Sequence, residues 1–272
     1  MRAPKEADYK TMALFFFVSL VIVVLYLVAY QIGMIQFVEV SSGGLIHRTL
    51  ILNVFLMLIA VYGILVLRGT LQGEDLGLDT KKVPTALVIG LTTWLLIQLI
   101  EGILGYIYTG VIEIDYRWGT DSLGLIGLLI GMLFGTALYE EVGYRGFMLI
   151  QFRMKMESLT ENKITQLILA IIISQFLFTL LHLPSKVLNQ GWTTAVLFDL
   201  LFSVFLNGVI YCLLYLRTEN LFFVMFVHAL GNAPTSLISP HIEPSNILLL
   251  LAIIWAMIWP SLQRWEESML SS

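Results

Sequence analysis

The chain has 272 residues, of which 58% are hydrophobic and only 12% are charged. A soluble domain carries about 25% charged residues, so this composition excludes an ordinary soluble enzyme. It also excludes a disordered chain, which has few apolar residues and a high charge. The formal net charge is -4 and the basic residues form no tract, so the sequence predicts no nucleic-acid partner. The single cysteine, Cys212, lies in an apolar run and is interpreted as a packing residue.

Eight apolar runs follow one another along the chain, and most are long enough to cross a bilayer as a helix. They lie near residues 11–35, 49–67, 84–108, 122–148, 164–182, 195–216, 221–238 and 246–260. The seventh and eighth runs are short, which fits helices that are tilted or partly buried in protein. The connections are brief, so we expect one integral membrane domain over residues 1–272. The predicted fold is all-α, a polytopic membrane protein with about eight transmembrane helices.

The lysines and arginines indicate the orientation, because they gather in cytoplasmic loops. Of the 15 basic residues, only Arg48, Arg117 and Lys186 fall on one side of an eight-helix arrangement. The other twelve fall on the side that holds both termini. We therefore expect a multi-pass protein of the cell membrane with both termini in the cytoplasm. Because Arg145 lies toward the same end of the fourth run, we expect the functional site to open on that side.

Ionisable side chains inside a bilayer cost several kcal/mol, so those of the fourth run require an explanation. Glu141 and Arg145 are four residues apart, a spacing that lets them form an ion pair on one helix face. Glu140 points about 100° away from Glu141 around the helix axis. We interpret Glu141 and Arg145 as a mutually satisfied pair, and Glu140 as the carboxylate that faces a cavity.

Two further pairs have the same four-residue spacing: Phe178 with His182 in the fifth run, and His228 with Asn232 in the seventh. Singly, each pair has an ordinary structural explanation, as core packing or a hydrogen-bonded histidine. Together with the two glutamates they predict a catalytic core within residues 122–238. The limits of the two runs place Glu140 toward the cytoplasmic end of its helix and His182 at the far end of the next, so either the fourth helix is displaced or the fifth begins well inside the cytoplasm.

Other polar or small residues are less informative. Gly127, Gly131 and Gly135 form a stripe at four-residue spacing, which predicts close helix packing. Three polar positions in or near the runs have no predicted role; they are Glu101, Asp199 and Asn207.

The ordered set of motifs resembles the CAAX protease and bacteriocin-processing family, also called the Abi family, of intramembrane glutamate proteases. That family carries Glu-Glu-x-x-x-Arg, Phe-x-x-x-His and His-x-x-x-Asn motifs, each on its own helix. The matching residues are Glu140, Glu141 and Arg145, then Phe178 and His182, then His228 and Asn232. The resemblance covers residues 139–232, whereas the earlier part of the chain matches only in hydropathy.

The resemblance implies a role for each motif residue. Glu140 is the general base that activates water and returns the proton to the leaving amine. His182 helps to hold that water, and His228 with Asn232 forms the oxyanion hole. The other three motif residues support the site.

The implied function is an intramembrane endopeptidase acting on peptides or on prenylated, lipid-anchored proteins at the lipid bilayer. We expect no cofactor and no metal. Zinc is the alternative, because His182, His228 and Glu140 form a ligand set that suits catalytic zinc. A non-enzymatic immunity or scaffold protein is the main alternative function. A proton-relaying transporter is another, although the two halves of the chain lack matching broken segments.

Overall fold

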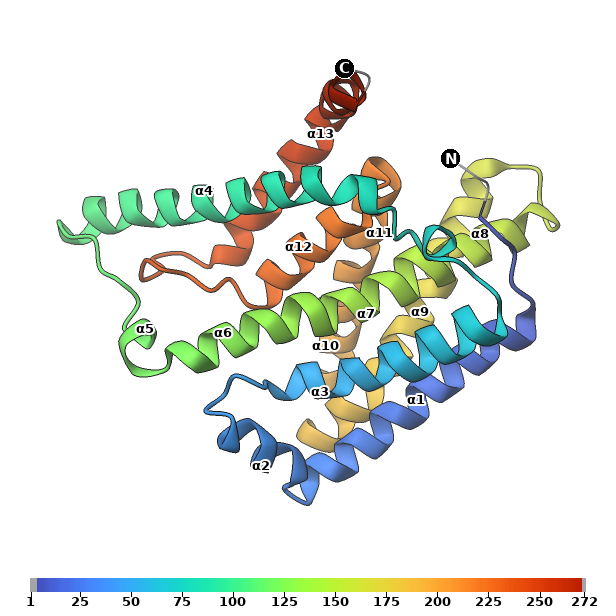
Figure 1. Cartoon of the computed structure of the whole chain (residues 1–272), viewed down its shortest axis with the longest axis horizontal. Helices are drawn as coiled ribbons and strands as arrows, with labels where there is room; N and C mark the ends of the chain where they lie inside the picture. Colours follow the sequence, from blue (N-terminus) through green and yellow to red (C-terminus); the bar gives the residue numbers. More distant parts are fainter. Residues whose placement is uncertain (1–3, 271–272) are drawn as a thin grey trace.

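The structure, a computed structural model shown in Figure 1, describes the backbone of residues 4–270 and the side chains of residues 4–262. Seven helices in the described range are long and apolar enough to cross a membrane. They are Tyr9–Gln31, Arg48–Arg68, Thr80–Thr109, Ser122–Glu157, Lys163–Gln190, Thr194–Thr218 and Pro244–Leu262. The predicted all-α, polytopic membrane architecture is confirmed. Arg2, one of the basic residues predicted on the side of the termini, lies outside the described residues, as does the side chain of Arg264.

Several long helices consist of consecutive segments with different hydrogen-bonding patterns. These are α3 (Arg48–Phe55) with η1 (Leu56–Arg68); α6 (Ser122–Ile130), η4 (Gly131–Ala137), α7 (Leu138–Glu140), η5 (Glu141–Leu149) and α8 (Ile150–Glu157); and α10 (Thr194–Asp199), η6 (Leu200–Leu206) and α11 (Asn207–Thr218). The uninterrupted helices are α1 (Tyr9–Gln31), α4 (Val83–Thr109), α9 (Lys163–Gln190) and α13 (Pro244–Leu270). The short ones are α2 (Met34–Ser41), η2 (Gly73–Leu76), η3 (Thr80–Lys82), α5 (Arg117–Thr120) and α12 (Leu221–Asn232).

The seventh predicted run is where the structure differs from the sequence analysis. Only its first part is helical, as α12, and 12 residues rise about 18 Å, too little for a bilayer core of about 30 Å. The prediction of a helix over residues 221–238 is therefore wrong. The following segment contains Pro234, Pro240 and Pro244, which lack a backbone N–H and disfavour a helical conformation in the preceding residue.

The non-helical segment after α12 is held by backbone hydrogen bonds. The Asp115 backbone N–H donates to the Leu237 carbonyl at 2.9 Å, and the Ser239 N–H donates to the Glu113 carbonyl at 2.9 Å. These bonds join the segment to the loop that follows α4. Within the described residues, seven helices are therefore long enough to cross a membrane, and α12 with its non-helical tail (residues 233–243) takes the place of the seventh predicted run.

The helices near the candidate site pack closely because of the predicted glycine stripe. A Cβ atom on Gly127 would lie 2.0 Å from the Gly44 carbonyl oxygen, and one on Gly131 would lie 2.5 Å from Oγ1 of Thr49. Gly135 faces the same helix, α3. The structure therefore confirms the packing role of the stripe. Figure 1 shows α1, α3 and the α6–α8 helix side by side, and α9 contacts both α1 and η5.

Candidate active site

Three helices bring one carboxylate and two imidazoles together. Glu140 is the last residue of α7, His182 lies in α9, and His228 lies in α12. Nε2 of His182 is 3.5 Å from one Glu140 oxygen, and Nε2 of His228 is 3.6 Å from the other. Glu140 lies between two π-helical segments, η4 and η5, a rare geometry that is found frequently at functional sites. The three side chains therefore converge from different parts of the sequence.

The length of α9 removes the difference in depth between Glu140 and His182. The sequence analysis ended this helix at residue 182, but it continues through Pro184 to Gln190. His182 consequently lies inside the helix rather than at its far end. The fourth helix also extends further than expected, to Glu157. α9 begins at Lys163, close to the predicted limit, so the expected earlier start is not found; the helix instead continues beyond His182, which lies 3.5 Å from Glu140.

The ring of His182 is held in a defined orientation. Its Nδ1 atom is 3.0 Å from the Phe178 carbonyl oxygen, one helical turn earlier. A carbonyl oxygen only accepts, so Nδ1 carries the hydrogen and Nε2 faces Glu140. The Phe178 ring packs edge-on against the imidazole, with ring centroids 4.6 Å apart. Phe178 thus positions His182 through both its backbone and its side chain.

His228 is oriented in a similar way by other partners. Its Nδ1 atom is 2.7 Å from Oε1 of Glu141, and its ring stacks on Tyr211 with centroids 4.7 Å apart. These contacts direct Nε2 toward Glu140. The contact between His228 and Glu141 was not predicted, because the spacing within one helix contains no information about α12.

Glu141 and Arg145 form the ion pair that their spacing predicts. Nη1 of Arg145 is 3.1 Å from Oε1 of Glu141, and both side chains are fully buried. Nη2 of Arg145 also donates to the Gly208 carbonyl at 3.2 Å and to Oε1 of Gln175 at 3.3 Å. The pair therefore ties η5 to α9 and α11 as well as to α12.

Aromatic rings enclose the arginine. The guanidinium carbon of Arg145 lies 4.6 Å from the centre of the Phe178 ring and 5.4 Å from the centre of the Tyr211 ring. Gln175 in turn donates to the sulfur of Cys212 at 3.0 Å, and this thiol is buried, as its packing role predicts. Sequence reasoning missed Gln175 and Tyr211. Gln175 is a polar residue inside an apolar run, one turn before Phe178, and that signal could have identified it.

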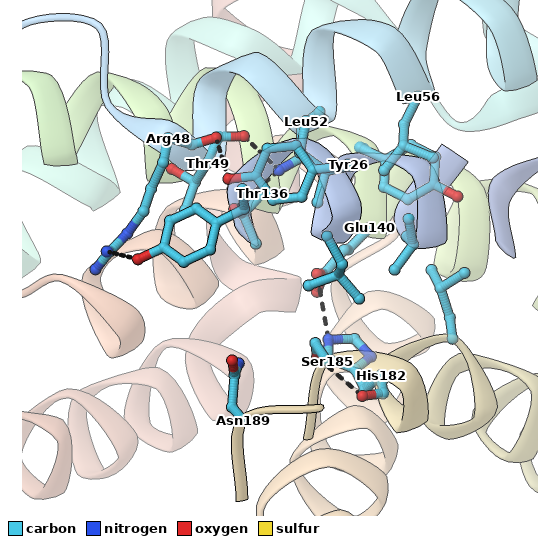
Figure 2. A pocket seen from close by; sticks show the side chains of 16 residues that line it. Tyr26, Arg48, Thr49, Leu52, Leu56, Thr136, Glu140, His182, Ser185 and Asn189 are labelled. Atoms are coloured by element: carbon cyan, nitrogen blue, oxygen red, sulfur yellow. Dashed lines mark hydrogen bonds and ion pairs between the residues drawn. The ribbon is translucent and has the colours of Figure 1, made fainter. Parts of the chain in front are cut away.

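A cavity of about 480 Å³ reaches Glu140 and His182 from between α1, α3 with η1, α7 and α9 (Figure 2). Glu140 is among its lining residues, whereas Glu141 is not. The side chain of Glu140 keeps 10% of its surface exposed, and that of Glu141 keeps none. The prediction that Glu140 rather than Glu141 faces a cavity is therefore confirmed.

The cavity extends toward the end of the molecule opposite the termini. Its lining includes Tyr30 near the end of α1, Arg48 at the start of α3 and Asn189 near the end of α9. The N-terminal segment lies at the other end, where the Lys5 backbone N–H donates to Asp75 at 2.9 Å. The expectation that the site opens on the side of the termini is therefore not met by this cavity.

Asn232 is the motif residue that the structure does not join to the others. It is the last residue of α12, its side chain is exposed, and within the described part of the chain no hydrogen bond links it to Glu140, His182 or His228. It lies one helical turn beyond His228.

The segment that follows Asn232 is held by side chains of α4. Oε1 of Gln98 accepts from the Leu237 backbone N–H at 2.6 Å, and Oε2 of Glu101 accepts from the His241 N–H at 2.7 Å. Glu101, which had no predicted role, therefore anchors this segment. The other two unassigned residues make local contacts: Asp199 pairs with Lys186, and Asn207 donates to the Ser203 carbonyl at 2.9 Å.

An ion pair between the buried Asp115 and the half-buried Arg117 lies beside the same segment, outside the membrane-spanning helices. Arg117 donates to both oxygens of Asp115, with Nε 3.0 Å from each. The hydrogen bonds from the Arg117 side chain hold the pKa of the Asp115 carboxyl below its usual value of 3.8. Trp118, the next residue, donates from its indole nitrogen to the Ser236 carbonyl at 2.9 Å. This loop therefore supports the extended tail of α12.

The fold and the site define a polytopic helical membrane protein in which a glutamate and two histidines meet inside the bundle. Residues 122–234 match the family model described as Rce1-like, type II CAAX prenyl endopeptidase. This stretch contains all seven motif residues, so the resemblance to the CAAX protease family is confirmed there. No curated protein and no solved structure matches the chain. The family match supports a hydrolase of the protease class in a membrane environment.

Proposed function

We propose that the chain is a CAAX-type intramembrane endopeptidase that hydrolyses peptide bonds of membrane-associated peptides or proteins with a water activated by Glu140. One observation carries the proposal. The Glu140 carboxylate lines a cavity and lies between the Nε2 atoms of His182 and His228, at 3.5 and 3.6 Å. The substrates we propose are prenylated or lipid-anchored proteins, because the matched family is one of prenyl endopeptidases.

The hydrogen-bonding capacity of Glu140 and His182 suits a water molecule. His182 has Nδ1 committed to the Phe178 carbonyl oxygen. In the neutral ring its Nε2 atom is then an acceptor, as are the Glu140 oxygens, and water supplies two donors. As the water oxygen bonds to the scissile carbonyl carbon, Glu140 takes its proton. Glu140 then delivers that proton to the amide nitrogen as the C–N bond breaks.

The negative charge on the carbonyl oxygen requires donors, and we assign them to His228 and Asn232. Because the Nδ1 hydrogen of His228 is directed at Glu141, its Nε2 atom donates only when the ring is protonated. Asn232 extends from the exposed end of α12, where its amide can meet a bound peptide.

The test is cleavage by the purified protein in lipid vesicles, followed by mass spectrometry of prenylated and unprenylated peptides. We expect the wild type to release a C-terminal fragment and the Glu140→Gln variant to release none, because an amide does not accept a proton from water. Glu157→Gln is the matched control, since Glu157 is an exposed residue of the same long helix. Equal cleavage by the wild type and the Glu140→Gln variant would contradict the proposed mechanism. If the wild type cleaves neither peptide, this result would favour the immunity or scaffold function.

We propose hydrolysis without a metal ion, and zinc is the alternative. Among the side chains of residues 4–262, no group of three or more His, Cys, Asp and Glu is arranged as a metal site. The experiment is the same cleavage assay with and without a strong chelator, together with elemental analysis. Unchanged turnover is the expected result. Loss of activity that one equivalent of zinc restores would make His182 and His228 ligands instead.

We also propose that both termini are cytoplasmic, on the basis of the basic residues near them. The chain has a single cysteine, and it is buried, so introduced cysteines can be labelled selectively. In intact cells an impermeant thiol reagent should label Asn189→Cys and leave Ser158→Cys, in the loop after α8, unlabelled. The reverse pattern would contradict this orientation.

A further inference from the structure

Two polar side chains in the cavity wall have hydrogen-bonding groups that the proposed mechanism does not use. They are Asn53, in α3, and Thr136, in η4. We propose that this pair binds the main chain of the peptide substrate: Oδ1 of Asn53 accepts from an N–H group, and the Thr136 hydroxyl donates to the carbonyl of the same residue. This inference rests on the proposed function, and it gives the site a contact that is independent of the substrate's side chains.

The side-chain amide of Asn53 has a free acceptor. Its Nδ2 atom donates to the Thr49 carbonyl at 2.8 Å and to Oγ1 of Thr136 at 3.1 Å. A carbonyl oxygen only accepts, so the first bond fixes which end of the amide is the nitrogen, and the two bonds use both of its hydrogens. Among the described residues no donor bonds to Oδ1 of Asn53. The residue is only 4% exposed and lines the cavity, so its orientation is fixed while one acceptor is left open.

The Thr136 hydroxyl has a free hydrogen. A threonine hydroxyl inside a helix commonly donates to a carbonyl one turn earlier. Four other helical threonines do so at 2.7 to 2.8 Å; they are Thr93, Thr109, Thr179 and Thr218. Thr136 accepts from Asn53, but within the described residues its own hydrogen has no acceptor. The wall of the cavity therefore contains a donor next to an acceptor.

A donor beside an acceptor matches the main chain of one extended residue. In an extended peptide the N–H and C=O groups of one residue point to the same side, which lets paired strands exchange two hydrogen bonds. Such main-chain bonds supply affinity without regard to sequence. Asn53 and Thr136 both belong to membrane-spanning helices, where an unpaired polar group costs free energy. An open polar pair at this depth suits a peptide better than an acyl chain.

The position of Thr136 relates the bound residue to the cleaved bond. Thr136 and Glu140 are four residues apart, and both side chains line the cavity (Figure 2). The helical rise between them is about 6 Å, whereas an extended peptide rises about 3.3 Å per residue. The bound residue therefore lies about two residues from the bond that the water attacks. Ordered water is the competing occupant of the same groups, and the experiments distinguish it from a peptide.

The first experiment replaces single peptide bonds of the substrate by esters, which lack the N–H group. Each bond within three residues of the cleaved one is replaced in turn. We expect the wild type to lose about threefold to tenfold in kcat/KM at one bond, about two residues from the cleaved one, because one hydrogen bond is lost. Asn53→Leu should cleave the all-amide peptide more slowly and show no further loss with that ester. A loss that persists in folded Asn53→Leu would overturn the assignment.

Thr179→Val is the matched control for this series. The Thr179 hydroxyl bonds within α9 and the residue does not line the cavity, so the variant should keep the ester effect of the wild type. Thr136→Val should lower kcat/KM about threefold to tenfold, and Thr136→Ser, which restores the hydroxyl, should recover most of that loss. Equal values for folded Thr136→Val and Thr136→Ser would contradict the donor role. This second pair of variants keeps the inference testable even if Asn53→Leu does not fold.

The second experiment measures binding without turnover, so that it is independent of the catalytic proposal. Glu140→Gln protein in neutral lipid vesicles is titrated with the same amide peptide and ester series. Binding of the amide about threefold to tenfold tighter than one ester, with the difference lost in Glu140→Gln/Asn53→Leu, supports the inference even if no cleavage is ever detected. Equal binding of the amide and every ester overturns it, whatever the activity, and leaves ordered water as the occupant.

Discussion

Glu140 and Glu141 are neighbours in the chain, but their carboxylates face two different regions of the molecule. Glu140 faces the cavity between α1, α3 and α9, and its nearest partners are imidazole nitrogens at 3.5 and 3.6 Å. Glu141 faces a closed region between α9, α11 and α12, where Arg145 and His228 contact one of its oxygens at 3.1 and 2.7 Å. A rotation of about 100° between consecutive helical residues is sufficient for this division.

This contrast explains why two adjacent acids are not redundant. A buried charge is tolerated when it is paired, so the closed region holds its ions in fixed positions. A general base, by contrast, needs space for a water molecule and a substrate within hydrogen-bonding distance of its carboxylate. We infer that the closed region stabilises and aligns the helices, and that the open region carries out the chemistry.

The largest expected effect on stability comes from breaking the closed region. Glu141→Gln leaves Arg145 buried without its anionic partner, and removing one member of a buried pair costs about 3–5 kcal/mol. The variant should therefore unfold at a clearly lower temperature than the wild type in the same detergent. Circular dichroism on heating measures this difference.

A second variant separates charge pairing from loss of packing. The double variant Glu141→Gln/Arg145→Met removes both charges and keeps an apolar side chain between Phe178 and Tyr211, so it should recover part of the lost stability. Wild-type melting of Glu141→Gln alone would show that the closed region does not depend on the ion pair.

The next expected effect is on turnover, and it tests whether the open region includes Asn232 at the end of α12. Asn232→Ala should lower turnover by about 10²–10³, because an oxyanion donor acts mainly in the transition state. Substrate affinity should change little, which a comparison of kcat with KM measures. A variant with normal turnover but weak binding would place Asn232 in substrate recognition and outside the oxyanion hole.

The smallest effect lies outside both regions, at the loop that holds the tail of α12. The pKa of Asp115 is lowered in the folded protein by its hydrogen bonds from Arg117, so ionised Asp115 favours the folded state above the usual pKa of 3.8. This contribution is lost as the pH falls through the lowered pKa. Wild type should therefore melt slightly higher than Asp115→Asn at pH 6, and the gap should close below about pH 4. A gap that is constant over this range would contradict the ionic contribution.

The sequence predicted those features that depend on local spacing. Apolar runs predicted the long helices, and the four-residue interval predicted the Glu141–Arg145 pair. The prediction of a helix over the whole of residues 221–238 was wrong, because α12 ends at Asn232, before the first of three prolines. Hydropathy alone does not show this effect of proline. Tyr211 and Gln175 were missed because their contacts with the motif residues form only when α9 and α11 pack together.

The sequence also did not predict the end of the molecule toward which the cavity extends. The basic residues predicted which side holds the termini, but part of the cavity wall is formed by the first two long helices, which carry none of the motifs. Arg48 entered the sequence analysis only as one of three basic residues on the outer side. Its place in the cavity follows from the packing of α3 against α1 and η4.

The division between the two glutamates is tested most directly by the turnover of Glu140→Gln, measured beside its melting temperature in the same preparation. The account predicts a loss of about 10²–10⁴ in turnover, the usual contribution of general acid–base catalysis, with a melting temperature close to that of the wild type. Turnover within a few-fold of the wild type in a folded Glu140→Gln protein would contradict it.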